Sequence, residues 1–359
     1  MGSDGVLHYH ILKKNKSIRA ISGVIAIILI LSISIFVITK LSNNKKTVSI
    51  IASNFISYDF ARAVTGDKSE VAMLLKPGVE MHNFEPTPED IINIKNADLF
   101  IHVGGESDEW VENLLEENEI PEEKTMRLMD LVEIKEEELS EGMEEHEHKH
   151  EHEHESKEFH EEHKHEYESK EPHEEYKHHH EEETEYDEHI WTSPVNAIRI
   201  VTGIKNKLSM FYPENENVYI KNADAYISRL SDIDQKIRDV VANSNKKELI
   251  FGDRFPFRYF VDEYGLDYYA AFPGCSEQTE ASSKTIAFLI NKAKSDSIKT
   301  ILKIELTSDK LAKSIADEAG AKVMTLSAAH NISSEDFEKG MTYADIMESN
   351  IKVLKEALK

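Results

Sequence analysis

The sequence predicts an α/β protein with two similar lobes, and three observations support this fold class. Short apolar segments alternate with amphipathic helical ones from residue 47 onward, and strands separated by helices indicate a parallel sheet covered on both faces. The alternation occurs twice, at residues 47–132 and 247–359. Between them, residues 189–246 carry long helical patterns that would join the lobes as a stiff backbone. We therefore expect a cleft between the lobes, the usual place for a ligand.

Length and charge narrow the classes of protein. The 359 residues allow two domains with appendages. Acidic residues outnumber basic ones by 68 to 42, giving a formal charge of -26. This excess argues against a nucleic-acid partner and suits a protein that attracts cations. The single cysteine, Cys275, excludes an internal disulfide framework and a Cys-rich zinc site.

The N-terminus predicts a membrane anchor. Residues 20–39 are almost entirely apolar, and 20 residues make a helix of roughly 30 Å, enough to cross a bilayer. Lysines and an arginine before this stretch favour a cytoplasmic segment at 1–19. No clear small-x-small cleavage site and no lipid-bearing cysteine follow it. We expect a single-pass anchor with the remainder outside the cell; a cleaved signal sequence is the alternative.

The first lobe begins with a strand at 48–52 and a helix at 58–64, which Gly66 ends. A second strand at 71–75 leads to Pro77-Gly78, and a helix follows at 89–96, with Thr87 as its N-cap. A strand at 98–103 and a helix at 107–117 complete the pattern. His82 lies on the loop after the second strand, where open α/β sheets bind ligands. Neutral imidazole is a common zinc donor, so His82 is a candidate ligand.

Residues 133–188 interrupt the pattern. Twelve histidines lie between His146 and His180, mixed with Glu and Lys and almost no aliphatic residues. Such a segment cannot bury enough apolar surface to offset its ordering entropy, so we expect disorder. His-rich tracts bind metals by composition, which makes this insert a metal-capturing segment.

The second half follows the same logic. His189-Ile190-Trp191 precedes a helix at 196–210, for which Ser193 is the N-cap, and a longer helix at 214–241 follows Pro213. Strands are expected at 248–251, 267–271, 300–304 and 321–326. Helices are expected after Pro256 and at 282–295, 309–318 and 341–358. Asp253 comes just after the expected strand at 248–251, and His330 just after the one at 321–326.

His82, His189, Asp253 and His330 share one context, because each lies at or just after the end of an expected element. Two of them fall before the second lobe and two within it. Four nitrogen and oxygen donors without cysteine suit tetrahedral zinc, whereas manganese prefers more oxygen.

A resemblance to a known family strengthens this interpretation. The run Pro77-Gly78-x-x-x-His82-Asn83-Phe84-Glu85-Pro86-Thr87-Pro88 resembles the signature of the metal-specific solute-binding receptors of ABC importers for zinc and manganese. The resemblance extends from about Thr47 to the C-terminus. It also includes Asp98-Leu99-Phe100 before Gly104-Gly105, the His189-x-Trp191 step and Tyr264-Gly265-Leu266. It implies two Rossmann-like lobes on a backbone helix, an ABC permease and ATPase as partners, and Zn²⁺ as the transported ligand.

The resemblance implies ligands at His82, His189, a third position near 253–254, and His330. The family has His or Glu where this chain has Arg254, which stays protonated and cannot donate to a metal. We therefore expect Asp253 as the third ligand, with Glu305 or a water as alternatives. In that family, a His-rich insert between the first two ligands marks zinc receptors.

Other functions compete with a zinc receptor. A manganese receptor of the same family is one alternative, and a zinc buffer or metal-dependent adhesin is another. A metallohydrolase would need an open metal position and a nearby general base. The chain has no His-Glu-x-x-His motif, so we expect no enzyme activity.

Overall fold

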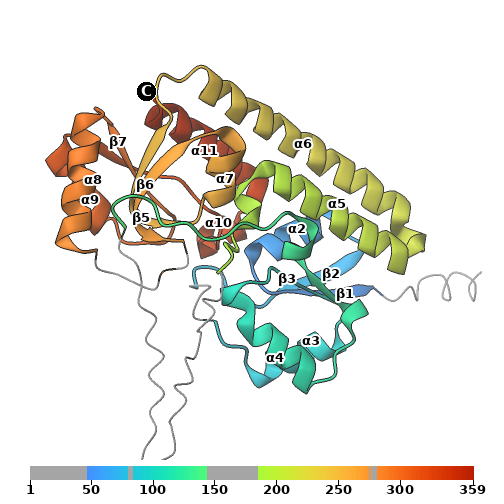
Figure 1. Cartoon of the computed structure of the whole chain (residues 1–359). Coiled ribbons are helices and arrows are strands. Elements are labelled where there is room, and N and C mark those ends of the chain that lie inside the picture. The colour runs from blue at the N-terminus through green and yellow to red at the C-terminus, as the bar shows by residue number, and fades with distance from the viewer. Residues whose placement is uncertain (1–46, 80–83, 144–184, 275, 277–280) are drawn as a thin grey trace, which may run out of the picture. The chain divides into compact units, whose positions relative to one another are not determined.

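Two four-stranded sheets form the core of the structure (Figure 1). The computed structural model describes residues 47–79, 84–143, 185–274, 276 and 281–359, and residues Ser49–Lys359 belong to one compact unit. The strand orders are β2-β1-β3-β4 and β6-β5-β7-β8. Sequence-adjacent strands are thus not always spatial neighbours, as expected when helices connect parallel strands.

The first lobe contains β1 (Val48–Ala52), α2 (Phe55–Thr65), β2 (Ser69–Met73), α3 (Pro88–Asn96), β3 (Leu99–His102), α4 (Glu109–Glu117) and β4 (Thr125–Arg127). Short 3-10 helices lie at Glu106–Asp108, Glu122–Lys124 and Leu128–Leu131. β3 pairs in parallel with β1 and with β4. The Asn54 side chain caps α2, and Thr87 and Asp90 form a reciprocal capping box at α3. These caps begin both helices close to the expected positions.

The backbone helices follow a 3-10 turn at Ile190–Thr192. They are α5 (Pro194–Phe211), a short 3-10 turn at Pro213–Asn215, and α6 (Glu216–Ala242). Ser193 caps α5 and Pro194 occupies its first turn. α6 contacts α5, α2 of the first lobe, and α11 (Tyr343–Ala357) of the second lobe. It is therefore the backbone that the sequence predicted (Figure 1).

The second lobe contains β5 (Glu248–Phe255), α7 (Arg258–Tyr264), β6 (Asp267–Pro273), α8 (Ser283–Ser295), β7 (Thr300–Lys303), α9 (Lys310–Ala319), β8 (Lys322–Thr325), α10 (Ser334–Glu338) and α11 (Tyr343–Ala357). β5 pairs in parallel with β6 and β7, and β7 with β8. The register of β5 against β6 shifts between Phe251 and Arg254. Asp253 thus lies within an irregular strand rather than after a finished one.

Ordered structure extends into both ends of the segment expected to be a disordered insert. The Glu137 amide donates to the Glu185 carbonyl and the Asp187 amide to the Lys135 carbonyl, each at 2.9 Å. Glu136 and Tyr186 form an antiparallel bridge. These backbone hydrogen bonds pair residues 135–137 with 185–187. The histidines of the insert, at 146–180, lie outside the described residues.

The expected membrane anchor at 20–39 also lies outside the described residues. Within the described part of the chain, no helix combines the length and hydrophobicity needed to cross a membrane.

Candidate metal centre

His189 directly precedes the 3-10 turn Ile190–Thr192 that leads into α5, and it is fully buried. Its carbonyl accepts a hydrogen bond from the Thr192 hydroxyl at 2.8 Å, and the Ile190 carbonyl accepts one from the Asn196 amide at 3.1 Å. These bonds close the 3-10 turn before α5. The ring of His189 is therefore carried by a turn whose backbone is held by the side chains of Thr192 and Asn196.

Asp187 contacts His189 twice through one oxygen. Its Oδ1 accepts the backbone N–H of His189 at 2.8 Å and lies 3.0 Å from Nδ1 of the ring. Asp187 is buried, and burial raises its pKa to about 7, although the hydrogen bond from the His189 amide acts in the opposite direction. A positive ion beside the imidazole would favour the ionised carboxylate.

His330 lies on the loop between β8 and α10, and that loop is held from both sides. Glu305, after β7, accepts the amides of Ala328 and His330 at 2.7 and 2.8 Å. The indole N–H of Trp191 donates to the Ala328 carbonyl at 2.7 Å. Ala329 adopts a left-handed conformation with φ +58°, which is costly for a residue with a Cβ. These contacts hold the backbone in that conformation and aim His330.

The imidazoles of His189 and His330 lie close together, and both contact the ring of Trp191. Their ring centroids lie 4.5 Å apart, although 141 residues separate them in sequence. The buried Trp191 ring lies 5.5 Å from the His189 ring and 5.8 Å from the His330 ring, edge to face in both cases. The structure therefore brings together two of the predicted ligands.

Asn331 ties this pair to the loop that leads to His82. Its side-chain amide donates to the Lys76 carbonyl at 2.9 Å and to the Val79 carbonyl at 2.6 Å. The residue beside His330 thus holds the chain three residues before His82. Residues 80–83, including His82 itself, lie outside the described residues.

Asp253 is buried beneath the loop after β7. Its Oδ2 accepts the Ile304 amide at 3.1 Å and the Thr307 hydroxyl, and its Oδ1 accepts the Arg254 amide at 2.9 Å. These bonds hold the loop that carries Glu305. A carboxylate has about four acceptor positions, so Oδ1 can accept more than the Arg254 amide.

Arg254 and Glu305 border a small cavity beside His330. Its volume is about 110 Å³, and it is lined by Gly78, Val79, Arg254, Ile304, Glu305, Leu306, His330 and Asn331. Burial raises the pKa of Glu305, but hydrogen bonding and the charge of His330 outweigh it, so the net pKa is lowered. Arg254, Glu305 and His330 thus line one small cavity.

The loop after β6 also reaches this region. A Cβ added to Gly274 would lie 3.2 Å from Cε1 and 3.3 Å from Nδ1 of His189. A side chain at this position would press against the ring of His189. Cys275, the next residue, lies outside the described residues.

Among the residues that the structure describes, no group of three or more His, Cys, Asp and Glu forms a ready metal site. The contacts that Asp187, Trp191 and Asn331 make in this region were not predicted from the sequence. Asp187 was assigned to the insert, although its separation of two residues from His189 was a usable signal. The contacts of Trp191 and Asn331 span 137 and more than 250 residues, and nothing in the sequence pattern marked them.

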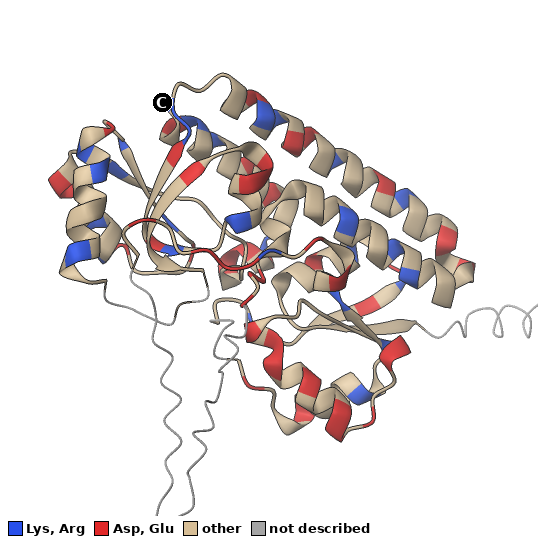
Figure 2. Cartoon of the chain, in the orientation of Figure 1, with Lys and Arg blue, Asp and Glu red and all other residues tan. Residues whose placement is uncertain are grey.

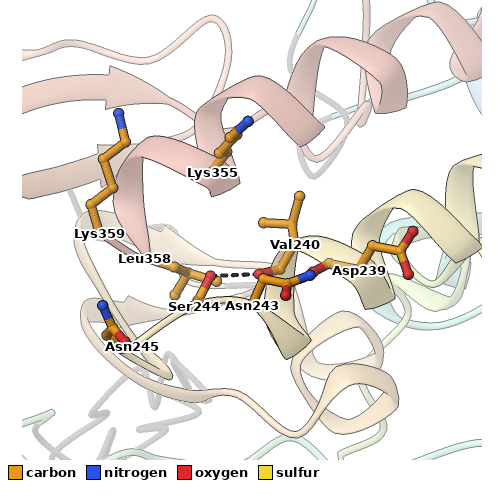
Figure 3. Close-up of a pocket in the computed structure, with 8 residues that line it drawn as sticks. All are labelled: Asp239, Val240, Asn243, Ser244, Asn245, Lys355, Leu358 and Lys359. Carbon is orange, nitrogen blue, oxygen red and sulfur yellow. Dashed lines mark hydrogen bonds between the residues drawn. The ribbon is translucent and has the colours of Figure 1, made fainter.

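A larger cavity lies away from these imidazoles (Figure 3). Its volume is about 390 Å³, and it is formed where α6 and α11 end, lined by Asp239, Val240, Asn243, Ser244, Asn245, Lys355, Leu358 and Lys359. The Ser244 hydroxyl donates to the Val240 carbonyl at 2.6 Å and closes the last turn of α6. Only Asp239 in this set is a usual metal donor, so this cavity does not resemble a metal site.

Comparison with known proteins identifies the family. The family model "ZnuA: Zinc-uptake complex component A periplasmic" matches residues 50–357. The chain belongs to this family.

Members and structures of the family agree with the fold. The high-affinity zinc uptake system protein ZnuA of Bacillus subtilis (strain 168) is 34% identical over 312 residues, 86% of this chain and 87% of that protein. The zinc-binding lipoprotein AdcA of Streptococcus pneumoniae (strain ATCC BAA-255 / R6) is 29% identical over 333 residues. That match covers 92% of this chain but 60% of AdcA, so the chain spans about three-fifths of that relative.

A solved structure supports the same architecture. The Zn(II)-bound ZnuA-like domain of Streptococcus pneumoniae AdcA superposes with a TM-score of 0.66 at 26% identity. The superposition covers 87% of this chain and 99% of that domain. The prediction of two α/β lobes is thereby confirmed.

Proposed function

We propose that this chain is an extracellular receptor that binds Zn²⁺ and passes it to the permease and ATPase of an ABC importer. The observation that carries the proposal is the pair of buried imidazoles, 4.5 Å apart between ring centroids, from the backbone segment and the second lobe. Asn331 joins this pair to the first-lobe loop that leads to His82. An ion bound by these residues would contact the first lobe, the backbone segment and the second lobe. The ion is the cargo of the receptor rather than a catalyst.

The proposed ligands are His82, His189, His330 and Asp253. Three neutral imidazoles and one carboxylate suit zinc better than manganese, and the carboxylate offsets part of the ion's charge. Asp253 supports the proposal through its buried position beside the Glu305 loop, where Oδ1 retains acceptor capacity. Arg254 cannot bind the metal, but its charge can pair with a carboxylate near the site.

The charge of the protein supports a cationic cargo. The acidic excess gives -26 over the whole chain, and such a field raises the local concentration of cations. Figure 2 shows acidic residues on α3 and α4 of the first lobe. α4 carries four glutamates and no basic residue. We propose that the His-rich insert adds weaker zinc sites to this field.

We also propose that residues 20–39 anchor the receptor in the cell membrane. The apolar sequence of this stretch supports the proposal. The intact mass of the mature protein tests it. A chain that starts before residue 20 is the expected result, and a chain that starts near residue 40 would show a cleaved signal sequence.

Competition titration tests the metal. We expect zinc to displace manganese from the purified full chain at neutral pH, and His189→Ala and His330→Ala to lose the tight site while the weaker sites of the insert remain. Stronger binding of manganese than of zinc would contradict the proposal. Unchanged tight zinc binding in both variants would also contradict it.

A further inference from the structure

Both described imidazoles are held in the same way, by a carboxylate on the Nδ1 side. For His189, Oδ1 of Asp187 accepts the residue's own backbone N–H at 2.8 Å and lies 3.0 Å from Nδ1. For His330, Oε1 of Glu305 accepts the backbone N–H at 2.8 Å and lies 3.6 Å from Nδ1. In each case, one oxygen faces both the amide and the ring nitrogen of a single histidine.

This arrangement favours one tautomer of each ring, more strongly at His189, where the oxygen is 3.0 Å from Nδ1, than at His330, where it is 3.6 Å away. Because the carboxylate oxygen already accepts the backbone N–H, it acts as an acceptor toward the ring and favours the proton on Nδ1. The lone pair is then on Nε2, at the opposite end of the ring. Without such a partner, a neutral imidazole in water carries its proton mainly on Nε2. A carboxylate that orients a histidine also raises the basicity of the ligand nitrogen.

Asp187 and Glu305 are themselves held in place by further hydrogen bonds. The Asp187 amide donates to the Lys135 carbonyl at 2.9 Å, and the Tyr259 hydroxyl donates to the Asp187 carbonyl at 2.7 Å. The same hydroxyl accepts the Lys135 amide at 3.0 Å. The second oxygen of Glu305 accepts the Ala328 amide at 2.7 Å. Neither carboxylate is positioned by its imidazole alone.

We infer that Asp187 and Glu305 are positioning residues that present Nε2 of His189 and of His330 to the zinc ion. The inference rests on the proposed function and assigns to Glu305 a role other than that of the alternative third ligand. It also gives a role to Tyr259 on α7, whose hydroxyl binds both Lys135, near the start of the insert, and Asp187, near its end. That hydroxyl holds Asp187 in register with Lys135, and so holds the carboxylate behind His189.

Nitrogen NMR of the zinc-free protein tests the tautomer directly. In the full chain labelled with ¹⁵N-histidine, signals of His189 and His330 are assigned by their loss in the two alanine variants. We expect a protonated Nδ1 and an unprotonated Nε2 at both. In Asp187→Ala, we expect His189 to shift toward protonated Nε2 while His330 is unchanged. A wild-type His189 with its proton on Nε2, or the same tautomer in Asp187→Ala as in wild type, would overturn the inference.

Zinc affinity supplies the second measurement. Orienting partners of metal-bound histidines typically contribute about 10- to 100-fold to affinity. We expect Asp187→Ala to lower zinc affinity within that range, and Asp187→Asn to lower it less, because the amide oxygen still accepts from Nδ1. Glu305→Gln should behave like Asp187→Asn. If Asp187→Ala does not fold, the tautomer in the zinc-free wild type decides, and a proton on Nε2 of His189 would overturn the inference.

Asp59→Asn is the matched control, because Asp59 is also a buried carboxylate and contacts Tyr226 and Tyr343 rather than an imidazole. Its zinc affinity should stay within twofold of wild type. A loss of affinity in Asp59→Asn as large as that in Asp187→Ala would show a nonspecific effect and overturn the inference. If wild type itself binds no zinc tightly, the proposed function fails, whereas the tautomers in the zinc-free protein still decide the orienting roles.

Discussion

At the scale of single residues, the proposed third ligand is where this chain departs from the signature that it otherwise resembles. Arg254 stands where a donor is expected, and Asp253 is its neighbour within β5. The carboxylate of Asp253 also holds the loop after β7 through the Ile304 amide and Thr307. A variant at this position therefore changes both a proposed ligand and a loop contact, and a test has to separate the two effects.

Asp253→Ala should weaken zinc binding by at least about 100-fold, about 2.8 kcal/mol, because it removes the only proposed charged donor. His82→Ala should be at least as damaging, whereas Glu305→Ala should weaken binding less than Asp253→Ala. Isothermal titration or chelator competition measures all three. Thr307→Val is the control, because it removes the hydroxyl bound to Asp253 but keeps the carboxylate. Equal losses in Thr307→Val and Asp253→Ala would show that Asp253 only supports the loop.

Gly274 offers a test of how closely the loop after β6 approaches His189. An added methyl would meet the Phe255 carbonyl at 3.1 Å and His189 Cε1 at 3.2 Å. We expect Gly274→Ala to displace the ring by a few tenths of an ångström. Its zinc affinity should fall clearly, whereas its melting temperature without zinc should stay close to that of wild type. Gly203→Ala, in α5, is the control, because its methyl meets the movable end of Leu131. Unchanged zinc affinity in Gly274→Ala would show that the loop moves aside.

At the scale of elements, the sequence predicted most of the helices because their caps and apolar periodicity are local. Thr87, Ser193 and Ser282 begin α3, α5 and α8 as N-caps. β4 was missed because three residues show no period, and α10 because five residues make little more than one turn. β5 was expected to end at residue 251, but its irregular pairing continues to Phe255. Pairing with a neighbouring strand is a long-range property, so the local pattern did not contain it.

The candidate site also has a part that the sequence could predict and a part that it could not. Histidines after strand ends could be predicted from the sequence, since parallel strands place their carboxyl ends at one edge. The partners of those histidines could not. The contact of Glu305 with His330 depends on how two loops of one lobe fold against each other. That of Asn331 with the Lys76 carbonyl depends on how the lobes meet.

The paired segments at the base of the insert predict that the insert can be removed. Residues 135–137 and 185–187 are joined by backbone hydrogen bonds and a bridge. Deleting residues 144–183 leaves residues 138–143 and 184 to connect them. We expect the deletion variant to keep one tight zinc site and to lose several weak ones, measured by titration calorimetry. Loss of the tight site would show that the insert contributes a ligand.

At the scale of the whole molecule, one buried carboxylate joins the two lobes to the backbone helix. Asp59 lies on α2, and its Oδ2 accepts the Tyr226 hydroxyl from α6 at 2.6 Å and the Tyr343 amide from α11 at 3.1 Å. The Tyr343 hydroxyl in turn donates to the Trp191 carbonyl at 2.6 Å. Asp59 therefore joins α2 to both α6 and α11.

The Asp59 junction gives the protein a defined pH dependence. Burial raises the pKa of Asp59 from 3.8 to about 6, although the hydrogen bonds from Tyr226 and Tyr343 act against it. Between these pH values, the folded protein holds a proton that the unfolded chain has released. The Asp59 contribution to stability is therefore complete below about pH 4, falls as pH rises to about 6, and is constant above that. A shift of about two units corresponds to about 3 kcal/mol.

Asp59→Asn should remove this dependence while it keeps both hydrogen bonds, because one amide oxygen can accept from Tyr226 and Tyr343 together. We expect the variant's unfolding free energy, minus that of wild type, to increase by up to about 3 kcal/mol between pH 4 and 6 and then to level off. Urea unfolding of the zinc-free proteins across this range measures the difference, and the other carboxylates cancel because both proteins share them. A difference that does not change with pH would mean that Asp59 is ionised throughout. The junction between the lobes and α6 would then contain a buried charge rather than a shared proton.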